Sequence, residues 1–151
     1  MLAGWPALAH AALGEVLPNT VELRDANLAR TYGTSVAELK AFQKSVAPAY
    51  AIHETTQDGV WVREYVTVND HKVFAVAWNG LAQPDLSVVL GLYTEEFRTA
   101  ERTQIRARGR RSLVVHAGRV TVERSGHMRD LRGRAFDAAL VPPGVGLDEI
   151  R

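Results

Sequence analysis

The chain has 151 residues, of which 46% are hydrophobic and 23% charged, which is the composition of a soluble globular domain. This length predicts one compact domain, and a formal net charge of +1 gives no global field that would favour a nucleic acid or an anionic membrane as partner. The lack of cysteine excludes a disulfide framework, a thiolate zinc site and a cysteine nucleophile.

The first residues are small and apolar and are typical of the end of a signal peptide. Ala9-His10-Ala11 fits the small-x-small pattern that signal peptidase recognises, and the composition changes sharply at Glu15. No basic residue precedes this segment, and the alternative is a short apolar helix packed on the core. We expect export to the periplasm or the medium. Residues 1–11 are then a residual signal-peptide-like segment, and residues 12–151 form a single α+β domain.

Two weaker helical patterns follow. Residues 18–34 carry scattered apolar groups and indicate a weak helix or an irregular lead-in. Thr34 then offers an N-cap, and Leu39, Phe42 and Val46 recur at helical spacing. We expect a short N-terminal helix at this second place.

Residues 50–79 carry the clearest pattern in the chain. Two tight-turn dipeptides, Asp58-Gly59 and Asn69-Asp70, separate three runs rich in Val, Tyr, Trp and Phe, which predicts a three-stranded antiparallel meander. With two-residue turns at both places, His53 lies opposite Glu64. Both faces of this sheet are largely apolar, so we expect it to be covered on both sides.

The same register divides the side chains of the meander between two different faces. One face carries small residues, namely Val60, Val62, Val66, Val68, Val73, Ala75 and Ala77. The other is aromatic and pairs Trp61 with Trp78 and Tyr65 with Phe74. We expect the aromatic face to be core, covered by the N-terminal helix and a second meander. The alternative is an exposed surface for a hydrophobic ligand or an oligomer.

Residues 85–103 predict an amphipathic helix. Asp85 supplies the N-cap, and six apolar residues follow at spacings of three and four, namely Leu86, Val89, Leu90, Tyr93, Phe97 and Ala100. This stripe is expected to pack on the face of small residues. Residues 105–111 contain four arginines and a glycine and indicate a solvated connector.

Residues 112–136 return to β character, in three runs separated by turns near Ala117-Gly118 and Ser125-Gly126. The runs are Ser112–His116, Arg119–Arg124 and His127–Phe136. Val141-Pro142-Pro143-Gly144 predicts an extended tail. The expected fold class is therefore α+β, with two antiparallel three-stranded meanders around one central amphipathic helix and a short N-terminal helix.

Several motifs of the β-rich part resemble a known family. They are His53-Glu54, Val62-Arg63-Glu64-Tyr65-Val66, Lys72-Val73-Phe74-Ala75-Val76-Ala77-Trp78, Pro84-Asp85-Leu86, Leu90-Gly91, Gly126-His127-Met128-Arg129, Gly133-Arg134-Ala135 and Leu140-Val141-Pro142-Pro143-Gly144-Val145. The chain is similar to the domain-of-unknown-function family 2844, small exported proteobacterial proteins. The resemblance implies an Ala-rich leader that ends before Ala12-Leu13-Gly14. It brings no activity, cofactor or catalytic residue.

The cross-strand pair of His53 and Glu64 is the sharpest candidate for chemistry. Their side chains can touch and form an acid/base pair, and the alternative is an ion pair or hydrogen bond at the sheet margin. The sequence contains no Walker loop, G-x-S-x-G, H-E-x-x-H or G-x-G-x-x-G motif. His116 and His127 fall at opposite ends of a predicted strand, so we expect no metal site and no cofactor.

Charge is distributed unevenly along the chain. Residues 1–97 hold six basic and eleven acidic side chains, a net −5, whereas residues 98–151 hold twelve arginines and six acids, a net +6. The arginines of the connector are Arg106, Arg108, Arg110 and Arg111. They could bind phosphate, a polyanion or an acidic protein surface, and the alternative is a solvated face. Aromatic residues are not interleaved with them, which disfavours specific nucleic-acid binding.

These patterns predict an exported, non-catalytic binding or assembly module of unknown ligand. The residues expected to bind are the four connector arginines together with Trp61 and Trp78. The alternative is a small hydrolase or lyase that uses His53 and Glu64. We expect a protein partner or polyanion, no transmembrane segment, and an oligomer interface, if there is one, on the aromatic face.

Overall fold

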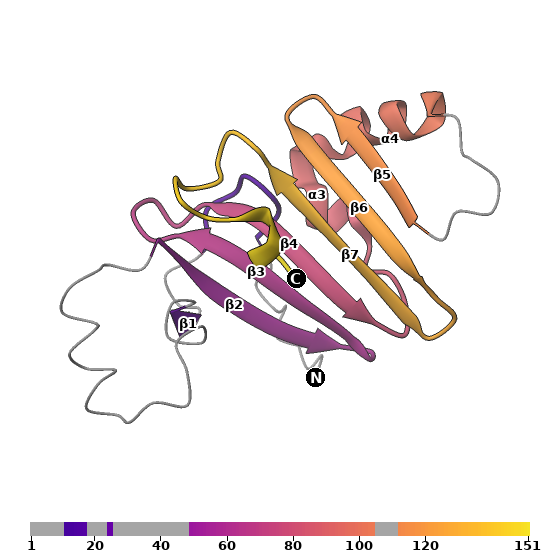
Figure 1. The fold of residues 1–151 in the computed structure, drawn as a ribbon, viewed down its shortest axis with the longest axis horizontal. Helices are drawn as coiled ribbons and strands as arrows, with labels where there is room; N and C mark the ends of the chain where they lie inside the picture. Colours follow the sequence, from indigo (N-terminus) through magenta and orange to yellow (C-terminus); the bar gives the residue numbers. More distant parts are fainter. Residues whose placement is uncertain (1–10, 18–23, 26–48, 105–111) are drawn as a thin grey trace, which may run out of the picture.

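The computed structural model describes residues 11–17, 24–25, 49–104 and 112–151 (Figure 1). The predicted N-terminal helix, the arginine connector and nearly all of the signal-peptide-like segment lie outside the described residues. In the part that is described, no helix is long and apolar enough to cross a membrane.

Two β-meanders make up the sheet, which confirms the α+β class. The first consists of β2 (Tyr50–Gln57), β3 (Val60–Thr67) and β4 (Val73–Gly80). The second consists of β5 (Ser112–Ala117), β6 (Val120–His127) and β7 (Asp130–Asp137). The last turn lies at Met128-Arg129 rather than at Ser125-Gly126, because Gly126 is a strand residue in close contact with the backbone of Asp130.

The two meanders join edge to edge into one sheet, of order β1-β2-β3-β4-β7-β6-β5 (Figure 1). β4 pairs antiparallel with β7, and the two-residue strand β1 (Arg24–Asp25) pairs with β2. The prediction that the meanders lie around a central helix is therefore wrong. Pairing of β4 with β7 satisfies backbone groups that would otherwise line two open sheet edges.

The first hairpin of the sheet has the predicted register, and the second does not. Asp58 and Gly59 both have positive φ, as a two-residue hairpin turn requires, and His53 pairs with Glu64. In β4, a bulge shifts the register by one residue between the partners of Tyr65 and Val66. A one-residue shift moves each later side chain of β4 to the other face.

The shifted register corrects the predicted pair of tryptophans. Trp61 lies opposite Asn79, whereas Trp78 lies opposite Val62. Side chains of directly paired residues share a face, and neighbours along a strand alternate. The two indole rings therefore lie on opposite faces of the sheet.

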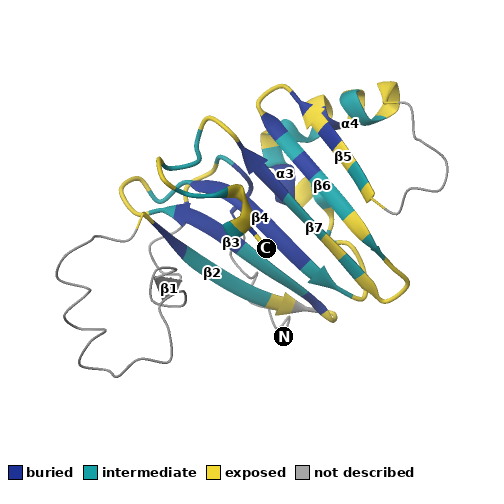
Figure 2. Cartoon of the chain, in the orientation of Figure 1, coloured by how far each residue is buried: buried dark blue, intermediate teal, exposed yellow. Residues whose placement is uncertain are grey.

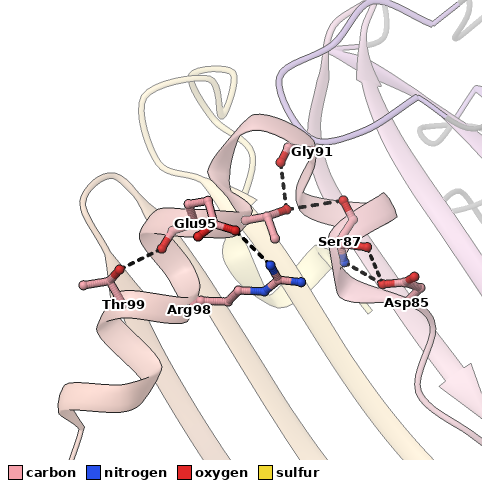
Figure 3. Close-up of polar contacts among 7 residues, drawn as sticks. Asp85, Ser87, Gly91, Glu95, Arg98 and Thr99 are labelled. Carbon is pink, nitrogen blue, oxygen red and sulfur yellow. Dashed lines mark hydrogen bonds and ion pairs between the residues drawn. The ribbon is translucent and has the colours of Figure 1, made fainter.

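The helical segment begins where the sequence predicts but is not one continuous α-helix. It consists of α3 (Leu86–Leu90), the 3-10 turn η1 (Gly91–Tyr93) and α4 (Thr94–Thr103). The Asp85 carboxylate accepts hydrogen bonds from the Ser87 amide at 2.8 Å and the Ser87 hydroxyl at 2.6 Å (Figure 3). These bonds lower the pKa of Asp85. Gly91 has a φ of +52° and lies against Ala12, which interrupts the α-helical geometry.

One face of the sheet is covered by this helical segment and by residues 11–17. Val89, Leu90 and Phe97 are buried against it, as the predicted stripe requires. From β4, the side chains of Val76 and Trp78 reach this face rather than those of Ala75 and Ala77, because of the bulge. We call this side of the sheet the helix face.

The opposite face is covered by the C-terminal segment, residues 138–151, over only part of its area. Ile150 is fully buried with Tyr50, Tyr65, Phe74 and Phe136. This corrects the prediction that the second meander covers the aromatic residues, because that meander lies beside them in the same sheet. We call this side the tail face.

The C-terminal segment is not the extended tail that its prolines predict. A turn joins the Val145 amide to the Pro142 carbonyl at 3.2 Å, and a 3-10 turn, η2 (Leu147–Glu149), follows. Figure 2 shows that β7 is exposed where it begins and buried where it ends, and of its buried residues Phe136 packs against this segment.

Candidate functional site

A cavity of about 550 Å³ lies on the tail face, where the C-terminal segment leaves the sheet uncovered. Two rows of side chains that run across the strands line it. The first row is Trp61, Asn79, Arg132, Ser125 and Ser112, which are successive partners on β3, β4, β7, β6 and β5. The second row is Arg63, Arg134, Glu123 and Val114. We call this cavity the Trp61 groove.

The floor of the groove is the main chain between the two rows. Trp78, Gly133, Arg124 and Leu113 line the cavity, yet their register places any side chain on the helix face. An added Cβ at Gly133 would lie 2.2 Å from Cζ2 of Trp78, so the glycine leaves room for the indole. Trp78 is 2% exposed. It is a core residue, as expected for the aromatic residues, but it does not share a face with Trp61 as the sequence predicts.

At the β3 end of the groove, Arg63 holds the ring of Trp61. The guanidinium carbon lies 3.8 Å from the ring centroid, which is a cation–π contact. Arg63 also donates from Nε to Glu54 Oε1 at 2.7 Å and from Nη1 to the Arg151 backbone oxygen at 2.8 Å. Because the guanidinium is held at three places, it fixes the orientation of the half-buried indole.

Two further arginines stand in the middle of the groove, each beside a carboxylate. Arg134 donates from Nε to Glu123 Oε2 at 2.8 Å and from Nη1 to the Ile150 carbonyl at 3.3 Å. Arg132 forms an ion pair with Asp130 at 3.0 Å, and its side chain is 63% exposed. Asn79, Ser112 and Ser125 add an amide and two hydroxyls. The groove therefore presents neighbouring donors and acceptors on a rigid sheet.

The predicted pair of His53 and Glu64 forms on the helix face. The distance from His53 Nδ1 to Glu64 Oε2 is 2.6 Å, and the side chains are 13% and 3% exposed. Glu64 also lines a second cavity of about 380 Å³ between β3 and α3, with Val62, Val76 and Val88. The geometry allows a proton to be shared between the imidazole and the carboxylate.

A buried polar network around Asp137 has no counterpart among the sequence predictions. Asp137 is fully buried and accepts from the Tyr93 hydroxyl at 2.9 Å, from Arg119 Nε at 2.8 Å and from the Ala139 amide at 2.9 Å. The hydrogen bond with Tyr93, and then the charge of Asp137, raise the pKa of Arg119. Tyr93 and Arg119 are distant from Asp137 in sequence, so no spacing predicts their contacts with it. The only local signal of this network is the Asx turn at Asp137.

The structure separates the residues that the sequence grouped for binding. Trp61 lies in the groove and Trp78 in the core, whereas Arg106, Arg108, Arg110 and Arg111 lie outside the described residues. The other polar groove residues went unpredicted, because the pairing of β4 with β7 brings them together.

The fold and the groove define a class, an α+β protein in which one antiparallel sheet of two meanders carries helices on one face and a polar groove on the other. The protein family of this chain is also clear. The chain matches the family described as "Protein of unknown function (DUF2844)" over residues 9–150, and it belongs to that family. No curated protein and no solved structure matches the chain.

Proposed function

We propose that this protein is an exported, non-catalytic binding module that holds its ligand in the Trp61 groove. The observation that carries this proposal is the groove itself. Its volume of about 550 Å³ lies within the range of about 300–1,000 Å³ that is usual for ligand sites. An aromatic ring at one end and polar side chains along both rows supply contact area and orientation.

The fixed geometry of the groove supports binding as its role. Arg63 is held by Glu54 and the Arg151 backbone, and Arg134 by Glu123 and the Ile150 backbone. Side chains that are ordered before a ligand arrives lose little entropy when it binds. The groove therefore has the preorganisation that a binding site needs.

Export is supported by the way in which residues 12–17 join the fold. The Leu13 amide donates to the Val89 carbonyl at 2.9 Å, and the Gly14 amide donates to the Val73 carbonyl at 2.8 Å. The residues that follow the predicted cleavage point after Ala11 are therefore hydrogen-bonded to α3 and β4. The bond between Ala11 and Ala12 is buried, so a peptidase would have to cut it before the domain folds.

Mass spectrometry of the intact protein from periplasm and medium tests the export proposal. We expect a chain that begins at Ala12, whose amino group would lie near the Glu15 carboxylate, since the Ala12 amide is 3.3 Å from Glu15 Oε2. Recovery of the uncleaved chain from the cytosol alone would contradict export.

Thermal-shift measurements with fractionated envelope extract test the binding proposal. We expect a fraction that raises the melting temperature of the protein but not that of Ser125→Tyr, which places a bulky ring in the groove. Leu92→Ala is the matched control, because Leu92 is 89% exposed on the helical segment. Equal responses of all three proteins would count against the groove.

The alternative function is that of a small hydrolase or lyase with His53 and Glu64 as its acid/base pair. It is favoured by the contact of 2.6 Å and by the second cavity beside Glu64. His53→Ala and Glu64→Gln separate the two functions. An enzyme would lose turnover with its fold intact, whereas a module that binds on the tail face would keep its ligand.

A further inference from the structure

We propose that the ligand of the Trp61 groove is an uncharged oligosaccharide. This inference rests on the proposed binding function and adds the chemical class of the ligand. Four features of the groove support it: its charge balance, its length, its floor and its aromatic end.

The first feature is that the arginines of the two rows are paired with carboxylates. Arg63 pairs with Glu54 at 2.7 Å, Arg134 with Glu123 at 2.8 Å, and Arg132 with Asp130 at 3.0 Å. A site for phosphate or a carboxylate would leave guanidinium charge uncompensated. Of the five arginines that line the groove, these three have a counter-charge, and Arg124 forms an ion pair with Glu101, so most of the groove favours a polar ligand without net charge.

The same pairs place hydrogen-bond donors next to acceptors. A guanidinium offers only N–H donors, and a carboxylate accepts at both oxygens. A sugar hydroxyl both donates and accepts, so two adjacent hydroxyls can bond to both members of such a pair. The Asn79 amide and the Ser112 and Ser125 hydroxyls have the same dual character.

The second feature is that the groove is elongated. Its first row runs from β3 to β5 across five neighbouring strands. Four strand spacings of about 4.8 Å give a length of about 19 Å. This length suits a chain of several sugar units and exceeds what one monosaccharide can fill.

The third feature is the floor, which disfavours an extended peptide. A peptide that binds to a sheet commonly pairs its backbone with an open strand edge. The groove instead crosses β4, β7 and β6, whose backbones are paired on both sides. A ligand in the groove must therefore be recognised by side chains. The many hydroxyls of a sugar chain suit this kind of recognition.

The fourth feature is the aromatic end of the groove. A pyranose ring has a face of C–H groups that packs against the π-face or edge of an indole through dispersion and weak C–H contacts. Trp61 is half-buried, and the Arg63 guanidinium at 3.8 Å from its centroid fixes its ring plane. The ring is therefore set in advance as a platform for one sugar unit.

Isothermal titration calorimetry of the full chain with length-matched oligosaccharides tests the proposal. The probes are neutral hexasaccharides, namely maltohexaose, cellohexaose, laminarihexaose, mannohexaose and hexa-N-acetylchitohexaose. A polyuronate hexasaccharide and an uncharged Gly/Ser hexapeptide serve as comparisons. We expect at least one neutral probe to bind, with an affinity that changes less than about twofold between about 0.05 and 0.5 M NaCl, because no charge is neutralised.

Three variants connect that binding to the groove. Trp61→Ala should weaken it by at least about tenfold, and Ser125→Tyr should abolish it. Ser125 is exposed, so this variant keeps the fold even if loss of Trp61 disturbs it. Leu92→Ala, on the helical segment, should bind as the unaltered chain does.

The possible failures are distinguishable. Groove-dependent binding of the polyuronate or of the peptide, with no neutral saccharide bound, would overturn the ligand class and leave the binding function intact. Oligosaccharide binding that Ser125→Tyr leaves unchanged would overturn both the ligand class and the groove as its site.

Discussion

The two faces of the sheet are covered by different means, and the difference locates the candidate site. On the helix face, α3, α4 and residues 11–17 bury a continuous apolar cluster that extends from β3 to β5. On the tail face, a single segment covers the aromatic residues near Tyr65 and Phe136 and leaves the remainder as a polar groove. An antiparallel sheet is stable when other elements cover one of its faces completely. Its second face can then stay open to solvent and bind a ligand.

The largest expected effect comes from the core tryptophan of the helix face. Trp78→Ala should lower the free energy of unfolding by about 3–5 kcal/mol, because it empties a large buried volume against Gly133. Trp61→Ala, on the tail face, is its matched control and should cost less, about 1–2 kcal/mol, since the ring is only half-buried. Urea denaturation measures both values. Equal losses would show that the two faces do not differ as described.

The buried network of the helix face should give the next largest effect. Asp137→Ala removes the partner of Tyr93, Arg119 and the Ala139 amide, and should cost about 3 kcal/mol in the free energy of unfolding. Asp148→Ala is the control, because Asp148 is exposed beside the tail face. If both variants melt at the same temperature, the network does not stabilise the helix face.

A smaller effect should follow from acid at the start of the helical cover. The pKa of Asp85 is lowered by hydrogen bonds from Ser87, so its stabilising contribution is complete above its unfolded pKa near 3.8 and is lost as the pH falls through its lower folded pKa. Asp85→Asn keeps a cap without this titration. NMR titration should place the pKa of Asp85 below 3.8, and the variant should lose less stability than the unaltered chain below about pH 4. A pKa of Asp85 at or above 3.8 would contradict this account.

The smallest effect on stability is expected from the connector that precedes β5. Replacing Arg106, Arg108, Arg110 and Arg111 by Gln should leave the melting temperature almost unchanged. It should weaken any association with an acidic partner surface or polyanion and flatten its salt dependence. Binding to a polyanion at several salt concentrations measures this, and a large fall in melting temperature would show that these arginines are structural.

Local patterns in the sequence predicted the parts of the fold that depend on neighbouring residues. Asp58-Gly59 set the register that joins His53 to Glu64, and Asp85 begins the helical segment as its cap. The apolar stripe at Val89, Leu90 and Phe97 indicated which side of the helical segment is buried. Each of these features depends on spacings of a few residues, which fix turn geometry and side-chain direction.

Tertiary structure decided how those parts are assembled, and with it the candidate site. Among the residues that line the groove, the sequence correctly predicted only Trp61. It placed Trp78 on the same face of the sheet as Trp61, because the bulge in β4 carries no recognisable signal. Arg132 reaches Asn79 only through the pairing of β7 with β4, which are separated by the helical segment and two further strands. Pairing between strands so far apart is selected by burial and by satisfaction of open edges over the whole molecule, and no local spacing encodes it.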